Sequence, residues 1–180
     1  MTLPLTLTLR AATAADIPAL SDLILTHGPN PWNWLPPDDV ALHLAEIAAG
    51  VNGTGGVLAL DQGELVGAVT FCTTRHFARY QDAADAGAPQ GYICEAVVHR
   101  AQAGRGIGAR LLTAAIDVLA ARGLREVYID RHEENAASAG MMRKAGFVEI
   151  DTFAEPARRP HGSGRTTVCR LRSVIAVPAR

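Results

Sequence analysis

The chain has 180 residues, of which 48% are hydrophobic, 19% charged and 5% aromatic, and its formal net charge is −1. This length is typical of one domain, here residues 1–180, that buries a core without disulfide or metal staples, and the composition excludes collagen, a coiled coil and general disorder. The near-neutral charge argues against nucleic acid as a partner. No apolar run approaches the ~18 residues that cross a bilayer, which argues against a membrane partner.

The N-terminus and the cysteines bear on the compartment of the protein. Residues 1–10 alternate Leu with Thr and lack the basic and apolar regions of a secretory signal. Cys72, Cys94 and Cys169 are odd in number and show no C-x-x-C spacing. We therefore expect reduced thiols in a cytoplasmic protein, with no metal site.

Hydrophobic periodicity and turn residues divide the first half of the chain into regular elements. Alternating apolar and polar residues predict a strand over 3–10. Thr13, with Asp16 three residues later, predicts the start of a helix that ends at Gly28. Prolines exclude regular structure over 29–37. A second helix over 38–50 and a hairpin of two strands, 57–60 and 65–72, complete this half.

The second half alternates strands with helices, after a long loop over 73–91 in which a helical turn is predicted near 76–82. Its predicted elements are strands over 92–98, 126–129, 147–153 and 166–171 and helices over 107–122 and 135–145. The order of elements predicts an α/β (α+β) fold. We expect a mixed, mostly antiparallel sheet of about seven strands, with at least one parallel crossover and with helices on both faces of the sheet.

The glycine-rich segment 103–112 is the most informative part of the chain. Glycines permit positive φ and close approach of a ligand, and a helix that begins in such a turn presents unpaired N–H groups to an anion. The dinucleotide fingerprint G-x-G-x-x-G requires its third glycine at position 109, where this chain has alanine. A P-loop requires Lys directly after Gly108, at the same position 109. A coenzyme A diphosphate loop and a tight connection without a ligand are the other two interpretations.

Two segments resemble the GNAT superfamily of acyl-coenzyme A-dependent N-acetyltransferases, within a likeness that covers about residues 7–171. In the first, a strand ending at Val98 leads into a turn ending at Gly108, similar to the family's Q/R-x-x-G-x-G/A loop. In the second, Asn135 to Phe147 resembles the family's N-x-x-A-x-x-L-Y-x-K-x-G-F segment. The resemblance implies a GNAT-like sheet whose central parallel strands, 92–98 and 126–130, splay apart to hold acetyl-coenzyme A (acetyl-CoA).

The resemblance also assigns residues to acetyl-CoA, which would serve as a co-substrate. Backbone N–H groups of the turn would hold its diphosphate, and strand and helix residues would flank its pantetheine arm. The cofactor-binding residues expected on this basis are Ala96, Val97, Val98, Ala103, Gly104, Arg105, Gly106, Ile107, Gly108, Ala109, Asn135, Ser138 and Met142.

The sequence departs from the family pattern at two positions. Ala103 stands where the family usually has Gln or Arg, so Arg105 or Arg110 could supply that charge. Met142 stands where many members have a tyrosine that protonates the departing thiolate, and a thioether cannot donate a proton. Another group or water could do so, or the step needs no acid, because a thiol of pKa about 8.5 is a reasonable leaving group.

An amine that attacks a thioester must lose a proton, and the developing oxyanion needs a hydrogen-bond donor. Glu95, in the half-apolar strand before the turn, is the predicted base, because desolvation should raise its pKa. The resemblance implies the N–H of Val97 or Val98 as the donor. Cys94 is interpreted as a packing residue rather than a nucleophile.

The sequence does not identify the acceptor, which we expect to be the amine of a small molecule or peptide. Trp32 and Trp34, the loop over 73–91 and the connection over 156–165 are candidate specificity segments. The arginines after Pro156 are interpreted by default as a solvated face. The alternative functions are a non-catalytic acyl-CoA-binding protein and, in third place, a nucleotide-dependent oxidoreductase. The last strands could pair across a homodimer.

Overall fold

The computed structural model describes residues 6–172, which form a seven-stranded sheet in the order β1-β2-β3-β4-β5-β7-β6. The predicted strand 3–10 corresponds to β1, and its residues 3–5 lie outside the described residues. All neighbouring pairs are antiparallel except β4 and β5. The strands are β1 (Leu7–Ala11), β2 (Gly55–Asp61), β3 (Glu64–Thr74), β4 (Gln90–Val98), β5 (Glu126–His132), β6 (Val148–Ala154) and β7 (Arg165–Arg172).

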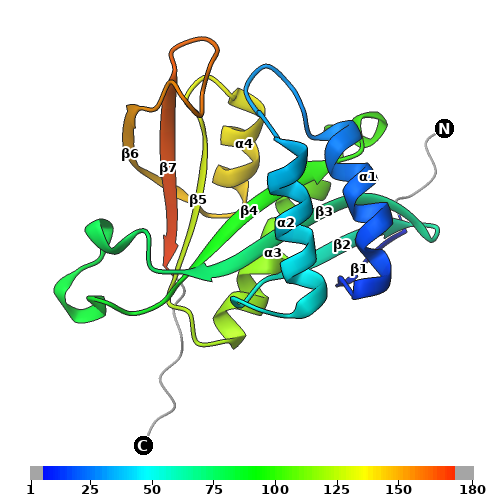
Figure 1. Cartoon of the computed structure of the whole chain (residues 1–180), viewed down its shortest axis with the longest axis horizontal. Coiled ribbons are helices and arrows are strands. Elements are labelled where there is room, and N and C mark those ends of the chain that lie inside the picture. The colour runs from blue at the N-terminus through cyan, green and yellow to red at the C-terminus, as the bar shows by residue number, and fades with distance from the viewer. Residues whose placement is uncertain (1–5, 173–180) are drawn as a thin grey trace, which may run out of the picture.

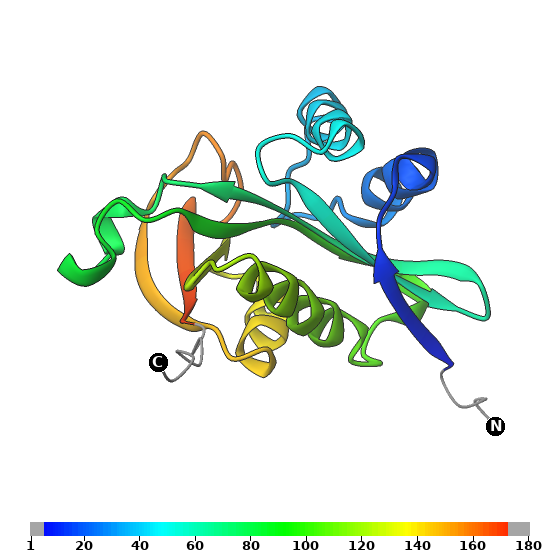
Figure 2. The ribbon, with the colours of Figure 1, turned by 90° about the horizontal axis from the view of Figure 1, so that it is seen from below.

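Helices cover both faces of the sheet, as the sequence predicts (Figure 2). α1 (Ile17–His27) and α2 (Pro37–Ala49) lie on one face, and α3 (Ile107–Ala121) and α4 (Ala136–Lys144) lie on the other. Each face has its own hydrophobic core: one is centred on Leu20 and Leu44, the other on Leu111 and Leu119. Of residues 6–172, none belongs to a helix that is both long and apolar enough to cross a membrane.

Local sequence explains where the first helix begins. The Asp16 carboxylate accepts hydrogen bonds from the Thr13 N–H (2.8 Å) and the Thr13 hydroxyl (2.7 Å), which forms the predicted capping box. The bond from the Thr13 N–H gives a partner to a backbone donor that a helix start leaves without one. α1 follows a single 3-10 turn (Ala14–Asp16) and is capped at Gly28.

The only parallel pair of the described sheet opens along its length. β4 and β5 pair at Gly91↔Val127 and Tyr92↔Tyr128 and at no later position. From there the two strands diverge toward their carboxyl ends (Figure 1). The predicted splayed pair is therefore confirmed, and it opens the middle of the sheet where backbone groups would otherwise be paired.

A β-bulge in β4 sets the orientation of the predicted base. Thr70 of β3 pairs with Glu95 and Phe71 pairs with Ile93, so Cys94 is the extra residue. Directly opposite residues share a face of the sheet. Thr70 Oγ1 lies 2.9 Å from His43 Nε2 of α2, so Glu95 projects from the face that α1 and α2 cover.

β5 is longer than the sequence predicts: the predicted strand ends at residue 129, whereas β5 continues to His132. The polar residues after Ile129 look like a loop when read alone. The ladder with β7 extends to His132↔Thr166 and supplies their backbone partners. Tertiary pairing thus overrides a weak local strand signal.

Candidate active site

Two cavities meet beside the splayed strands. The first, which we call the gap cavity, has a volume of about 390 Å³ and lies between β4, β5, the α1–α2 connection and Arg158–Arg159. The second, the loop cavity, has a volume of about 410 Å³ and lies between the glycine-rich turn and the first turns of α4. The two cavities share six lining residues: Ala96, Val98, Ala103, Ala137, Ser138 and Met141.

The glycine-rich turn has the geometry of an anion site. Gly104 and Gly106 have φ of 77° and 75°, and a Cβ at either would meet no atom within 4 Å. α3 begins at Ile107, directly after Gly106, so the N–H groups of its first turn have no partners within the helix. Open space, positive φ and unpaired donors together fit a diphosphate group.

The structure brings most of the expected cofactor residues together. Arg105 lines neither cavity; its guanidinium contacts Gln102 and lies 3.7 Å from Asp61. Val97, Asn135 and Met142 line the gap cavity only. The remaining nine line the loop cavity: Ala96, Val98, Ala103, Gly104, Gly106, Ile107, Gly108, Ala109 and Ser138.

Glu95 lines the gap cavity and is partly buried. Desolvation is the main cause that raises the pKa of its carboxyl group to about 8, and the negative charge of Asp130 acts in the same direction. The positive charges of Arg158 and Arg159 oppose this shift. A carboxylate with a pKa near neutrality can accept a proton from an amine and release it to water.

A cluster that the sequence did not predict supports one wall of the gap cavity. Asp130 accepts hydrogen bonds from Arg158 (2.9 Å), Arg159 (2.6 Å) and the Tyr92 hydroxyl (2.8 Å). The Arg159 side chain is only 6% exposed, so the interpretation of these arginines as a solvated face is wrong for Arg159. Burial of its charge is tolerated because Asp130 and Thr166 satisfy the guanidinium.

The direction of the backbone N–H groups in β4 follows from one hydrogen bond. The His99 N–H donates to the Val66 carbonyl of β3 (2.9 Å). N–H groups alternate in direction along a strand, so the N–H of Val97 also faces β3. The N–H groups of Ala96 and Val98 face the opposite side, where β5 has diverged.

Several other reactive groups near the cavities have structural partners. Cys94 Sγ lies 3.6 Å from Cys72 Sγ, and this contact together with burial raises the pKa of the Cys94 thiol well above its ordinary value. A thiol held protonated is a poor nucleophile. The His99 ring packs against the His27 ring at a centroid distance of 3.9 Å. Tyr128 lines neither cavity and stacks on Phe77 instead.

Of the segments proposed to contact the acceptor, the one with Trp32 and Trp34 lines a cavity and the loop over 73–91 does not. Trp32 and Trp34 line the gap cavity; Trp32 packs against the buried His132 at 4.6 Å, and Trp34 is 60% exposed. None of the residues 73–91, the predicted loop, lines either cavity.

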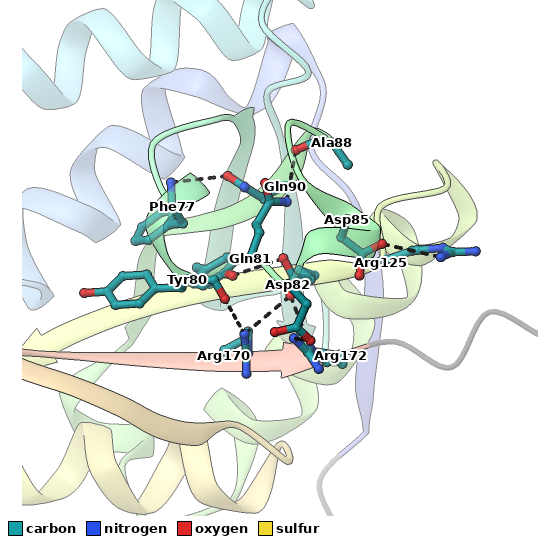
Figure 3. Close-up of polar contacts among 12 residues, drawn as sticks. Phe77, Tyr80, Gln81, Asp82, Asp85, Ala88, Gln90, Arg125, Arg170 and Arg172 are labelled. Carbon is teal, nitrogen blue, oxygen red and sulfur yellow. Dashed lines mark hydrogen bonds and ion pairs between the residues drawn. The ribbon is translucent and has the colours of Figure 1, made fainter.

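The segment between β3 and β4 instead packs against β5 and β7 (Figure 3). Arg170 donates to the Tyr80 carbonyl oxygen (2.7 Å), and Arg172 pairs with Asp82 (2.5 Å). The helical turn predicted near 76–82 is the 3-10 turn Ala78–Tyr80, and a second 3-10 turn, Ala83–Asp85, follows it. Phe77 and Tyr80 stack with Tyr128 of β5 and line neither cavity.

Comparison with known families agrees with this geometry. The family model described as "Acetyltransferase (GNAT) family" matches residues 17–147, well over half of the chain. The chain belongs to the GNAT acetyltransferase family. A comparison with curated protein sequences gave no match.

Solved structures of GNAT proteins share the fold at low sequence identity. Arabidopsis thaliana NAA60 in complex with acetyl-CoA has a TM-score of 0.75 and 15% identity, over 93% of this chain and 98% of that chain. The ribosomal-protein-S5-alanine acetyltransferase of Vibrio fischeri gives 0.72 and 16%, over 99% and 98%. YncA of Salmonella typhimurium, a putative acetyltransferase with acetyl-CoA, gives 0.67 and 22%, over 96% and 98%. These likenesses establish the GNAT fold.

Proposed function

We propose that the protein is an N-acetyltransferase that moves the acetyl group of acetyl-CoA to a primary amine of a small molecule or peptide by direct attack. One observation carries this proposal: a cavity suited to a diphosphate meets a second cavity that contains a carboxylate of raised pKa. The first would hold the acyl donor and the second the acceptor. Holding both reactants in adjoining sites removes much of the entropic barrier of a bimolecular reaction.

The loop cavity fits acetyl-CoA through this chain's own backbone. N–H groups of the turn from Gly104 to Ala109 would hold the diphosphate. Ala96 and Val98 would flank the pantetheine arm, and the Val98 N–H would donate to the thioester carbonyl oxygen as charge develops there. The bound co-substrate supplies an activated acetyl group; the protein supplies position and a donor.

Glu95 would act as the general base. An amine is largely protonated at neutral pH and attacks only after it loses a proton. Glu95 would accept that proton directly or through one water molecule and pass it to solvent. Asp130 would be a positioning residue, because it holds Arg158 and Arg159 at the cavity wall and helps to set the pKa of Glu95.

A thiol-release assay with acetyl-CoA and a panel of amines tests the proposal. The panel should contain small amines and peptides with free α-amino groups, and Glu95→Gln is the matched catalytic variant. We expect release for at least one amine, and a fall of about 10²- to 10⁴-fold in Glu95→Gln. Tight CoA binding without turnover of any amine would instead indicate a non-catalytic acyl-CoA-binding protein. Thermal stabilisation by NAD or NADP but not by acetyl-CoA would refute both functions.

A further inference from the structure

The junction of the two cavities is where the thioester sulfur must lie if the proposed function is correct. The acyl donor would extend from the loop cavity, and the amine would approach through the gap cavity. The atoms that exchange bonds can meet only at the lining that both cavities share. The residues there therefore surround the bond that breaks.

Only one of the six residues shared by the two cavities has a side chain that can donate a proton or a hydrogen bond. Five of them are alanine, valine or methionine, whose side chains carry no O–H or N–H group. The sixth is Ser138. Met142, one turn later on the same face of α4, is buried and also has no donor.

Ser138 is held in place, but its hydroxyl group is not engaged. The Ser138 N–H donates to Asn135 Oδ1 (3.1 Å), which fixes the residue in the first turn of α4. Within residues 6–172 the hydroxyl has no hydrogen-bond partner, and the residue is half-buried. A half-buried hydroxyl without a protein partner, at the wall of a cavity, is free to turn toward a ligand atom.

We infer that the Ser138 hydroxyl donates a hydrogen bond to the sulfur that leaves when the acetyl group is transferred. The new N–C bond forms while the C–S bond breaks, and the electron pair of the C–S bond goes to sulfur. The first proton of the ammonium group has already passed through Glu95 to solvent, and the second, which the nitrogen must lose once the N–C bond has formed, also goes to Glu95. Ser138 keeps its own proton, because an alcohol is a much weaker acid than a thiol, and the thiolate takes a proton from water after release.

The ionisation of the thiol in bound CoA tests this contact without any turnover. A hydrogen bond to the thiolate should favour the ionised form of the CoA thiol over its neutral form by a factor of about 10 to 100. Loss of this hydrogen bond should therefore raise the pKa of the bound thiol by about one to two. The variants are Ser138→Ala, which removes the donor, and Ser138→Thr, which keeps it. Ser21→Ala is the matched control, because Ser21 lies on α1 and lines neither cavity.

The thiolate is followed by its ultraviolet absorbance as the pH of the CoA complex is raised. For Ser138→Ala we expect a raised thiol pKa and an approximately 10-fold or larger loss of kcat. Ser138→Thr, which keeps the donor, should have a thiol pKa below that of Ser138→Ala, and Ser21→Ala should keep the wild-type values of both the thiol pKa and kcat. The affinity for CoA at low pH, where the thiol is protonated, should stay within about threefold. This pattern would separate hydrogen bonding to sulfur from a structural role.

The outcomes distinguish this inference from the function on which it rests. An unchanged thiol pKa in Ser138→Ala would overturn the contact even if the protein acetylates amines. A raised thiol pKa in a protein that acetylates no amine would support the contact and refute the N-acetyltransferase function. Failure of the wild-type protein to bind CoA would overturn both.

Discussion

Replacing Glu95 by Gln tests the central electrostatic feature of the site without any substrate. In the folded protein the pKa of Glu95 is raised from an ordinary value of 4.5 to about 8, chiefly by desolvation. Between those two pH values the folded state binds a proton that the unfolded state has released. The free energy of unfolding of the wild type should therefore fall as pH rises through this window.

The size of the effect follows from the two pKa values. Between pH 5 and pH 8 the titration of Glu95 alone should lower the free energy of unfolding by about 3.5 kcal/mol. Glu95→Gln has no carboxyl group to titrate, so the difference between variant and wild type isolates this contribution. For a chain of this length the difference corresponds to roughly 7 to 14 °C in Tm.

Urea unfolding of both proteins at pH 5, 6, 7 and 8 measures the difference directly. The variant should become progressively more stable than the wild type as pH rises. Two curves that remain parallel over this range would show that Glu95 titrates at an ordinary pKa, and our reasoning about its desolvation would be refuted. The catalytic counterpart is a rise of kcat/KM with pH up to about 8 in the wild type that is lost in the variant.

Further predictions concern the neighbours of these groups. Gly106→Ala should lower the free energy of unfolding by about 1 kcal/mol, because the residue has a positive φ, and should weaken CoA binding at least ~10-fold in isothermal titration. The control Gly63→Ala, at a φ of 88° in an open turn, should lower stability by the same amount but leave CoA binding unchanged. Asp130→Asn should lower the free energy of unfolding by roughly 3 to 5 kcal/mol, because the buried Arg159 guanidinium loses its carboxylate partner, and should move the pH–rate profile to lower pH. Arg158→Gln should move that profile to higher pH, because its charge stabilises the Glu95 carboxylate; an opposite shift would contradict this account. Trp34→Ala should change stability by less than ~0.5 kcal/mol but raise KM for the acceptor, and an unchanged KM for every amine would remove Trp34 from the acceptor site.

Local signals in the sequence were enough for most elements of the fold. Thr13 with Asp16, the prolines over 29–37 and Gly50 mark helix ends through interactions within a few residues of each other. The glycine-rich turn was recognisable for the same reason, since positive φ and an exposed helix start are properties of a short segment. The two motifs that resemble the GNAT superfamily then indicated the splayed strands, which the ladder between β4 and β5 confirms.

The remaining features depend on residues far apart in the chain, and the tertiary structure alone decided them. Arg159 is buried because Asp130, 29 positions earlier, reaches its guanidinium group, and composition cannot reveal such a partner. The bulge at Cys94 appears only when β4 pairs with β3. Ser138 was assigned to the cofactor by its motif, but its place at the junction of two cavities follows from how α4 packs beside β4. A sequence specifies local conformation through neighbouring residues, whereas burial and juxtaposition exist only once distant segments have come together.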